Sequence, residues 1–272
     1  MVAIDNKPSE LVEEADVSLL EITQATTAVF ADLYFRMPFL FFIKHGEKKV
    51  TLSNGDVFLG KAGDLMVFPA GASVTMENRP LYDKNYRADG VGFNTKLIDE
   101  VFYDQPLNGR KQDIYILRAD EHQPFEVLEL IKDTLNHDKL PQIIRHHRLL
   151  EPLLWLKDKG VVLSAHSDSQ PLSKIRRIIE QDLSHSWRAN DIAQMLAMSE
   201  PTFRRWLSKS DLSYSKILNN SRLEYGLSLL QTTDMQISQI ALECGFKTPS
   251  HFSDSFRKRF NIAPKMIRFT DI

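Results

Sequence analysis

Polar side chains, most of them hydrogen-bond donors, are interleaved with phenylalanines near the end of the chain. Phe252, Phe256 and Phe260 recur at every fourth residue, which places them on one face of a helix. The remaining positions are polar: Ser250, His251, Ser253, Asp254, Arg257 and Lys258. Side chains of this kind hydrogen-bond to base edges and phosphates in the major groove of DNA. The spacing therefore predicts a helix with one face in a protein core and the other suited to DNA.

A shorter helix precedes this one and fixes how it is presented. Its apolar residues fall at i, i+3, i+4 and i+7: Ile237, Ile240, Ala241 and Cys244. Gly245 follows at the position where helices turn out through a left-handed residue. Thr248 is a good N-cap, and Pro249 suits the first helical position. Helix, tight turn and helix together predict a helix-turn-helix unit.

The amino-acid sequence of this region resembles the signature of the AraC/XylS family of bacterial transcription regulators. The match is Ile237-x-x-Ile-Ala-x-x-Cys-Gly-Phe246, then Phe252, Phe256-Arg-Lys and Ala263-Pro264. A second motif that resembles the family covers residues 191–199 and reads Asp-Ile-Ala-x-x-Leu-x-Met-Ser. The resemblance implies a domain with two helix-turn-helix units. The chain departs from the family at Asn261, where Gly is usual, and at Asp254, where a basic residue is common.

The resemblance also implies which side chains meet DNA. The matching base-contact positions are Pro201, Arg204 and Arg205 in the first unit and Pro249, Ser250, His251 and Asp254 in the second. Phe203 and Leu207 point inward by their spacing, which leaves the two arginines outward. The expected phosphate contacts are Arg188, Lys247, Arg257 and Lys258. Asp254 either accepts from cytosine N4 or braces a neighbouring arginine, and the brace is the favoured interpretation.

A helix over 214–231 is predicted to join the two units. At 1.5 Å per residue it spans about 27 Å. Successive major grooves on one face of DNA lie about 34 Å apart. One chain could therefore place a recognition helix in each of two adjacent grooves.

Composition sets limits on the whole chain. Its 272 residues allow two domains, and the 43% hydrophobic content is ordinary for a globular protein. Residues 171–272 hold 15 Lys and Arg against 10 Asp and Glu, whereas the rest of the chain is acidic. One cysteine excludes an internal disulfide and a Cys-cluster metal site. No apolar run is long enough to span a bilayer, and the acidic start does not resemble a targeting peptide, so we expect a cytoplasmic protein.

Short apolar segments separated by turn signals fill 17–118. Asn54-Gly55 between two such segments is a strong hairpin signal. The run Gly63-Asp64 to Pro69-Ala-Gly71 resembles the cupin-type β-barrel that many AraC/XylS members carry as a sensor. The expected fold class is therefore α+β: an antiparallel, cupin-like β-barrel with helices, followed by an all-α domain of two helix-turn-helix units.

Some cupins are metalloenzymes, and the sequence was tested for that alternative. Their site needs clustered histidines and a glutamate. Residues 72–77 after the Pro-Ala-Gly turn contain no histidine, and His45 is the only one in the barrel segment. No nucleophile and base can be paired either. We expect no metal, no cofactor and no enzymatic activity.

A barrel lumen is a natural pocket for one small ligand. Strand alternation separates Phe39, Phe41 and Ile43 from Leu40, Phe42 and Lys44. If the second set faces inward, Lys44 could neutralise an acidic effector. The candidate effector residues are Leu40, Phe42, Lys44 and Phe68, although aromatic density of this kind fits an ordinary packed core as well.

Two helices are predicted over 122–159, and the second is apolar on more than one face. Leu150, Leu153, Leu154 and Trp155 are its candidate dimerisation residues, because helices at this point often mediate dimerisation in the AraC/XylS family. Packing within the domain is an equal alternative. The expected domains are 17–163 for sensing and dimerisation, a linker over 164–171, and 172–272 for DNA binding.

These observations favour a sequence-specific transcription regulator, an activator, that binds promoter DNA, works with RNA polymerase and responds to a small apolar or acidic effector. Two alternatives stay open: a cupin-type enzyme with an attached DNA-binding domain, and a dimeric regulator without a ligand.

Overall fold

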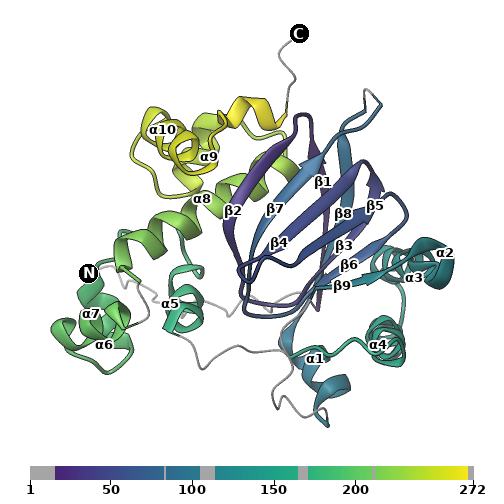
Figure 1. Cartoon of the computed structure of the whole chain (residues 1–272). Helices are drawn as coiled ribbons and strands as arrows, with labels where there is room; N and C mark the ends of the chain where they lie inside the picture. The colour runs from purple at the N-terminus through teal and green to yellow at the C-terminus, as the bar shows by residue number, and fades with distance from the viewer. Residues whose placement is uncertain (1–15, 83, 105–113, 165–170, 210–211, 269–272) are drawn as a thin grey trace, which may run out of the picture.

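Two antiparallel β-sheets form the first half of the molecule (Figure 1). The structure is a computed structural model that describes residues 16–82, 84–104, 114–164, 171–209 and 212–268. Its strands are β1 (Val17–Gln24), β2 (Ala28–Phe35), β3 (Phe39–His45), β4 (Glu47–Leu52), β5 (Val57–Lys61), β6 (Leu65–Phe68), β7 (Ala72–Arg79), β8 (Tyr86–Phe93) and β9 (Tyr115–Leu117). One sheet has the order β1-β8-β3-β6-β9, and the other has the order β2-β7-β4-β5.

The two sheets do not close into a barrel, so the expectation of a closed barrel was wrong. Among the described residues, no strand of one sheet pairs with a strand of the other. The sheets instead pack face to face, with Phe41 and Met66 from one and Val50 and Val74 from the other in the same buried cluster. Closure would need edge strands that share backbone hydrogen bonds. The antiparallel, two-layered character of the prediction is confirmed.

Local sequence signals explain the strands. Gly55 adopts a left-handed φ of 91° in the turn between β4 and β5, and its N–H donates to the Leu52 carbonyl at 3.0 Å. The predicted Asn-Gly hairpin is thus confirmed. In β3, Phe41 and Ile43 face the other sheet, whereas Leu40 and Phe42 face away from it, as alternation predicted.

Helices cover the outer face of the five-stranded sheet. They are α1 (Thr95–Phe102), α2 (Ala119–His122), α3 (Pro124–Asn136) and α4 (Gln142–Asp158). Leu40 and Phe42 of β3 pack with Leu128 of α3 and Leu149 of α4 in a second buried cluster. Figure 1 shows α3 and α4 on the far side of this sheet from α8.

Helices alone form the last hundred residues. They are α5 (Pro171–Ile179), α6 (Ala189–Met195), α7 (Glu200–Ser208), α8 (Tyr214–Thr232), α9 (Ile237–Glu243), α10 (Pro249–Phe260) and the 3-10 turn η1 (Pro264–Ile267). α6 with α7, and α9 with α10, make the two predicted helix-turn-helix units. The turn residues Ala197 and Gly245 both have left-handed φ, at 54° and 73°.

The second unit shares a core with the sheets, while the first has its own. Phe256 and Phe260 belong to the buried cluster that fills the space between the sheets, and the Phe30 and Phe260 rings lie 5.4 Å apart, edge to face. Phe203 and Ile192 of the first unit belong to a separate cluster. Most of the predicted linker, 165–170, lies outside the described residues. In the described part of the chain, no helix has the length and apolarity to cross a membrane.

Candidate DNA-reading surface and effector cavity

α7 presents the first DNA-reading surface. Its cap Ser199 accepts from the N–H of Thr202, and Phe203 and Leu207 are buried as predicted. Pro201, Arg204 and Arg205 lie exposed on the opposite side. Arg204 donates to the Glu200 carboxylate at 2.7 and 2.9 Å. Within the described residues Arg205 has no side-chain partner, so its guanidinium is available to a guanine base.

α10 presents the second surface. Thr248 caps it by accepting from the His251 N–H at 3.2 Å, with Pro249 at the first position. The other predicted contact residues are all exposed: Lys247, Ser250, His251, Asp254, Arg257 and Lys258. The His251 ring packs edge to face on Phe246, with the ring centroids 5.3 Å apart.

Asp254 has no arginine partner in the described part of the chain. Neither Arg257 nor Lys258, the basic residues one turn further along α10, pairs with its carboxylate. The favoured ion pair between Asp254 and a neighbouring arginine is therefore not formed. The Asp254 carboxylate is exposed on the solvent side of α10. Arg188, a predicted phosphate contact, is exposed at the N-cap of α6, where its N–H donates to the Asp191 carboxylate at 2.9 Å.

α8 holds the two reading surfaces in a fixed relation. It has 19 residues and so spans about 28 Å at 1.5 Å per residue. Gly226 packs directly against the second unit: a Cβ there would lie 2.7 Å from Phe252 and 3.3 Å from the Cys244 sulfur. Close packing against Phe252 and Cys244 therefore leaves no room for a side chain at this position of α8. Cys244 is a core residue as predicted, and burial raises the pKa of its thiol to about 12.

A buried ionic network fastens α8 to its surroundings. Glu224 of α8 accepts from both Arg176 of α5 and Arg259 of α10. Arg259 also donates to the Asp32 carbonyl of β2 at 3.3 Å, and Arg36 of the sheet pairs with Glu180 at 2.8 Å. One carboxylate of α8 thus ties α5 to α10 of the second unit, and Arg259 ties α10 to the sheet.

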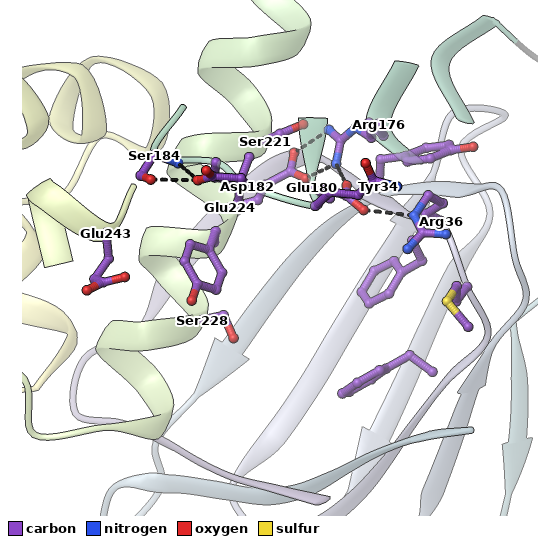
Figure 2. A pocket seen from close by; sticks show the side chains of 16 residues that line it. Tyr34, Arg36, Arg176, Glu180, Asp182, Ser184, Ser221, Glu224, Ser228 and Glu243 are labelled. Atoms are coloured by element: carbon purple, nitrogen blue, oxygen red, sulfur yellow. Dashed lines mark hydrogen bonds and ion pairs between the residues drawn. The ribbon is translucent and has the colours of Figure 1, made fainter. Parts of the chain in front are cut away.

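Figure 2 shows this network on one wall of a broad cavity, with Arg176, Glu224, Glu180 and Arg36 side by side. The cavity has a volume of about 660 Å³ and lies between the sheets and the helical domain. Its α8 wall carries the polar side chains of Ser221, Glu224 and Ser228.

A smaller cavity of about 190 Å³ lies between the sheets and α8. Most of its lining is apolar, with Phe35, Phe39 and Phe41 from the sheets and Leu227 from α8. The polar part of the lining comes from Lys48 and Asn78 of the sheets and from Glu224, Ser228, Gln231 and Thr232 of α8. Lys48 of β4 is fully buried in it. Apolar walls around one cation are typical of a site for a small amphiphilic anion.

Lys48 is poorly satisfied. Its Nζ has one oxygen partner among the described residues, Asn78 Oδ1 at 2.7 Å, and otherwise approaches Met76 Sδ at 3.0 Å and the Phe41 ring at 4.0 Å. Burial lowers its pKa well below the ordinary value, because the charged form loses its hydration. An anion in the cavity would supply the missing charge and acceptors.

None of the four predicted effector residues lines this cavity. Leu40 and Phe42 face the helical layer, and Lys44 pairs with the buried Asp89 at 2.7 Å, so the inward set is the other one. Phe68 lies in the core between the sheets but does not line this cavity. Sequence reasoning missed Lys48, although its position two residues before the buried Val50 is the inward one on an alternating strand.

Of the four predicted dimerisation residues, two are buried and two are at least partly exposed. Leu150 and Leu153 are buried within their own subunit by the packing of α4 on the sheet. Leu154 is 51% exposed, and Trp155 is half-buried. Within the described residues, no three His, Cys, Asp or Glu side chains group as metal ligands.

Known proteins resemble this chain over both parts. Residues 192–269 match the model of a helix-turn-helix domain family. The chain is 31% identical to the HTH-type transcriptional regulator YdeO of Shigella flexneri over 197 residues, which cover 68% of this chain and 74% of YdeO. It is 32% identical to the transcriptional activator PerA of Escherichia coli O127:H6 over 156 residues, and the match spans 57% of each chain.

The fold also resembles a solved one. A crystal structure of unsaturated fatty acid bound ToxT from Vibrio cholerae superposes with a TM-score of 0.62 and 19% identity, covering 91% of this chain and 92% of ToxT. A likeness at this identity establishes the fold: antiparallel sheets followed by a domain of two helix-turn-helix units. Together with the relation to YdeO, these findings show that the chain belongs to the AraC/XylS family of transcription regulators.

Proposed function

We propose that the protein is a sequence-specific, DNA-binding transcription regulator that activates its promoters. The observation that carries this proposal is the pair of helix-turn-helix units on one rigid helix, each with an exposed polar recognition face. The similarity to PerA, a transcriptional activator, supports activation as the sign of regulation. An activator of this kind would act through RNA polymerase, which is the partner we propose beside promoter DNA.

We further propose that a small carboxylic acid is the effector and that it binds in the cavity around Lys48. Apolar walls suit the hydrocarbon part, and the buried, under-coordinated Nζ suits the carboxylate. The ToxT structure with a bound unsaturated fatty acid supports the same class of ligand. A homodimer through the exposed part of α4 around Leu154 remains a prediction, which sedimentation of wild type and Leu154→Asp would test.

The DNA-binding proposal is tested by first selecting a binding site from random duplexes with the purified protein. Arg205→Ala should then weaken binding to the selected site by about 1–3 kcal/mol while leaving thermal unfolding unchanged. Lys209→Ala, an exposed basic residue just beyond α7, is the matched control and should change binding little. Equal affinity of wild type and Arg205→Ala for the selected site would show that α7 does not read bases as proposed.

The effector proposal is tested by isothermal titration with octanoate and with 1-octanol. The two probes have eight carbons each and differ in the head group, so the difference in affinity reports the exchange of a charged carboxylate for a neutral hydroxyl. Octanoate should bind more tightly, because its charged carboxylate is a stronger acceptor for the buried Lys48 than a hydroxyl. Equal binding of the two probes would contradict the assignment of a carboxylic acid.

A further inference from the structure

Four buried or half-buried polar side chains form a continuous path from Lys48, on the sheet side of the effector cavity, to Gln231, on its α8 side. Lys48 Nζ donates to Asn78 Oδ1 at 2.7 Å, and Asn78 Nδ2 donates to Gln24 Oε1 at 2.9 Å. Gln231 Nε2 of α8 donates to the same Gln24 oxygen at 2.8 Å. We call these four residues the amide relay. Lys48, Asn78 and Gln24 are completely buried, so water does not compete for their hydrogen bonds.

When Lys48 is protonated, it sets the direction of every bond in the relay. An ammonium group can only donate, so the Asn78 oxygen then faces it and the Asn78 NH₂ faces Gln24. The Gln24 oxygen therefore accepts from Asn78, and its NH₂ is turned to the Thr26 carbonyl at 2.7 Å. This orientation of Gln24 is also the one that lets Gln231 donate to it. The hydrogen bonds at the cavity and the hydrogen bond from α8 thus both depend on the orientation of the Gln24 amide.

A carboxylate in the cavity competes with this arrangement. It is a stronger acceptor than the neutral Asn78 amide and draws the Lys48 Nζ toward itself. The Asn78 oxygen then loses its only donor in a place that water does not reach, which is unfavourable for a buried acceptor. Turning the Asn78 amide restores a partner, but it presents an oxygen to the oxygen of Gln24. Gln24 must turn in response, and its oxygen leaves Gln231.

The far end of the relay is well placed to affect DNA binding. Gln231 lies in the last turn of α8, immediately before the segment that leads into α9 and the second helix-turn-helix unit. α8 also carries Glu224, which accepts from Arg176 of α5 and from Arg259 of α10 in the second unit. A change in how the end of α8 is held to the sheets therefore alters the setting of the second recognition helix.

We propose that Gln24 is the positioning residue that couples effector binding at Lys48 to DNA affinity, through the bond from Gln231. This inference rests on the proposed function, since it needs an acidic effector and a DNA-binding activity. Gln24 contacts neither ligand in this scheme and acts by passing a change in hydrogen-bond direction from one domain to the other. The coupling is a property of the relay and is separate from affinity at either site.

The experiment measures the affinity of the full chain for its selected DNA site with and without saturating octanoate, in wild type, Gln24→Met and Gln231→Met. Methionine keeps the length of glutamine but neither donates nor accepts in the relay. Gln142→Met is the matched control: it makes the same substitution at an exposed glutamine at the start of α4, which belongs neither to the relay nor to the cavity lining.

In wild type and Gln142→Met, octanoate should change the DNA dissociation constant by a factor in the usual range for coupled sites, about 5- to 150-fold. In both methionine variants that factor should fall to about one, while octanoate itself still binds through Lys48. Reciprocity gives a second readout, because DNA must change octanoate affinity by the same factor in wild type and by none in the variants.

The outcomes separate the two proposals. If wild type does not bind octanoate, or if its DNA affinity does not respond, the proposed function fails before the relay is tested. If wild type responds and both methionine variants respond equally, the relay does not carry the coupling and the inference is overturned. Because Gln231 is only half-buried, Gln231→Met keeps the test valid even if Gln24→Met folds poorly.

Discussion

Replacing Lys48 with methionine tests the effector cavity most directly. Methionine keeps an unbranched side chain of similar length in the cavity but removes the Nζ, and with it the donor that a carboxylate would use. Lys49→Met is the matched control. Lys49 is the next residue of β4, and it faces away from the core that holds Lys48 and Val50.

The expected loss follows from the environment of Nζ. The side chain is completely buried and has a single oxygen partner, so a carboxylate would form a charge-assisted bond shielded from water. Bonds to charged groups contribute about 1.5–3 kcal/mol, which corresponds to an octanoate affinity roughly 10- to 150-fold weaker in Lys48→Met. Lys49→Met should bind octanoate as wild type does.

The pH dependence of octanoate affinity provides a second, independent test of this placement. Burial lowers the pKa of Lys48 in the empty cavity, and a bound carboxylate favours the ammonium form and raises it again. Between those two pKa values the complex holds a proton that the empty protein lacks, so octanoate affinity should fall as pH rises through this window. Titrations in two buffers of different ionisation enthalpy should show proton uptake in wild type and none in Lys48→Met.

Stability should respond to pH in the opposite sense. The unfolded chain keeps the Lys48 proton up to its ordinary pKa of 10.5, whereas the folded chain releases it at a lower pH. The unfolded state therefore binds more protons between those values, and the free energy of unfolding rises with pH there. Lys48→Met should remove this rise. Unchanged octanoate affinity in Lys48→Met, with no proton uptake in wild type, would refute the placement of the effector head group at Lys48.

Three further variants test the architecture that carries the reading surfaces. Glu224→Gln should lower the free energy of unfolding by about 3–5 kcal/mol in urea melts, because two buried arginines lose their shared carboxylate; a loss below 1 kcal/mol would mean the network is well solvated. Gly226→Ala should lower stability by up to about 2 kcal/mol despite better helix propensity, because the new Cβ meets Phe252, and a gain would show that Phe252 gives way. Asp254→Ala should raise affinity for random DNA and reduce discrimination at one C·G pair of the selected site by about 1–3 kcal/mol, whereas an unchanged base preference in the selection would show that Asp254 reads no cytosine.

Sequence alone was sufficient for the helical domain because its signals are local. The i, i+4 spacing of Phe252, Phe256 and Phe260 decides which side of α10 is buried, and it simultaneously decides that His251 and Asp254 are exposed. Thr248 and Gly245 fix the ends of two helices through bonds that span a few residues. Capping and helical periodicity need no knowledge of distant segments.

In the sheets, alternation separated the faces of β3 but could not say which face is inward. Leu40 and Phe42 are as apolar as Phe41 and Ile43, because helices cover one face of the sheet and the second sheet covers the other. A strand that is buried on both sides carries no polar face to orient it. The choice of Lys44 over Lys48 as the cavity cation followed from this ambiguity. In the same way, pairing between edge strands, which decides barrel or open layers, depends on residues far apart in the chain.

What the sequence by itself determined, then, is the family, the two helix-turn-helix units and the exposed faces of α7 and α10. Only the tertiary structure brought Lys48 and Asn78 from the sheets, Gln24 from β1 and Gln231 from α8 into one hydrogen-bonded path. Gln24 and Gln231 are separated by 207 residues, and neither has a neighbour in sequence that marks it as functional. Local periodicity reports which face of an element is buried, but the partners of a buried polar group are set by how the elements pack, and in this protein those partners connect the proposed effector to the proposed response.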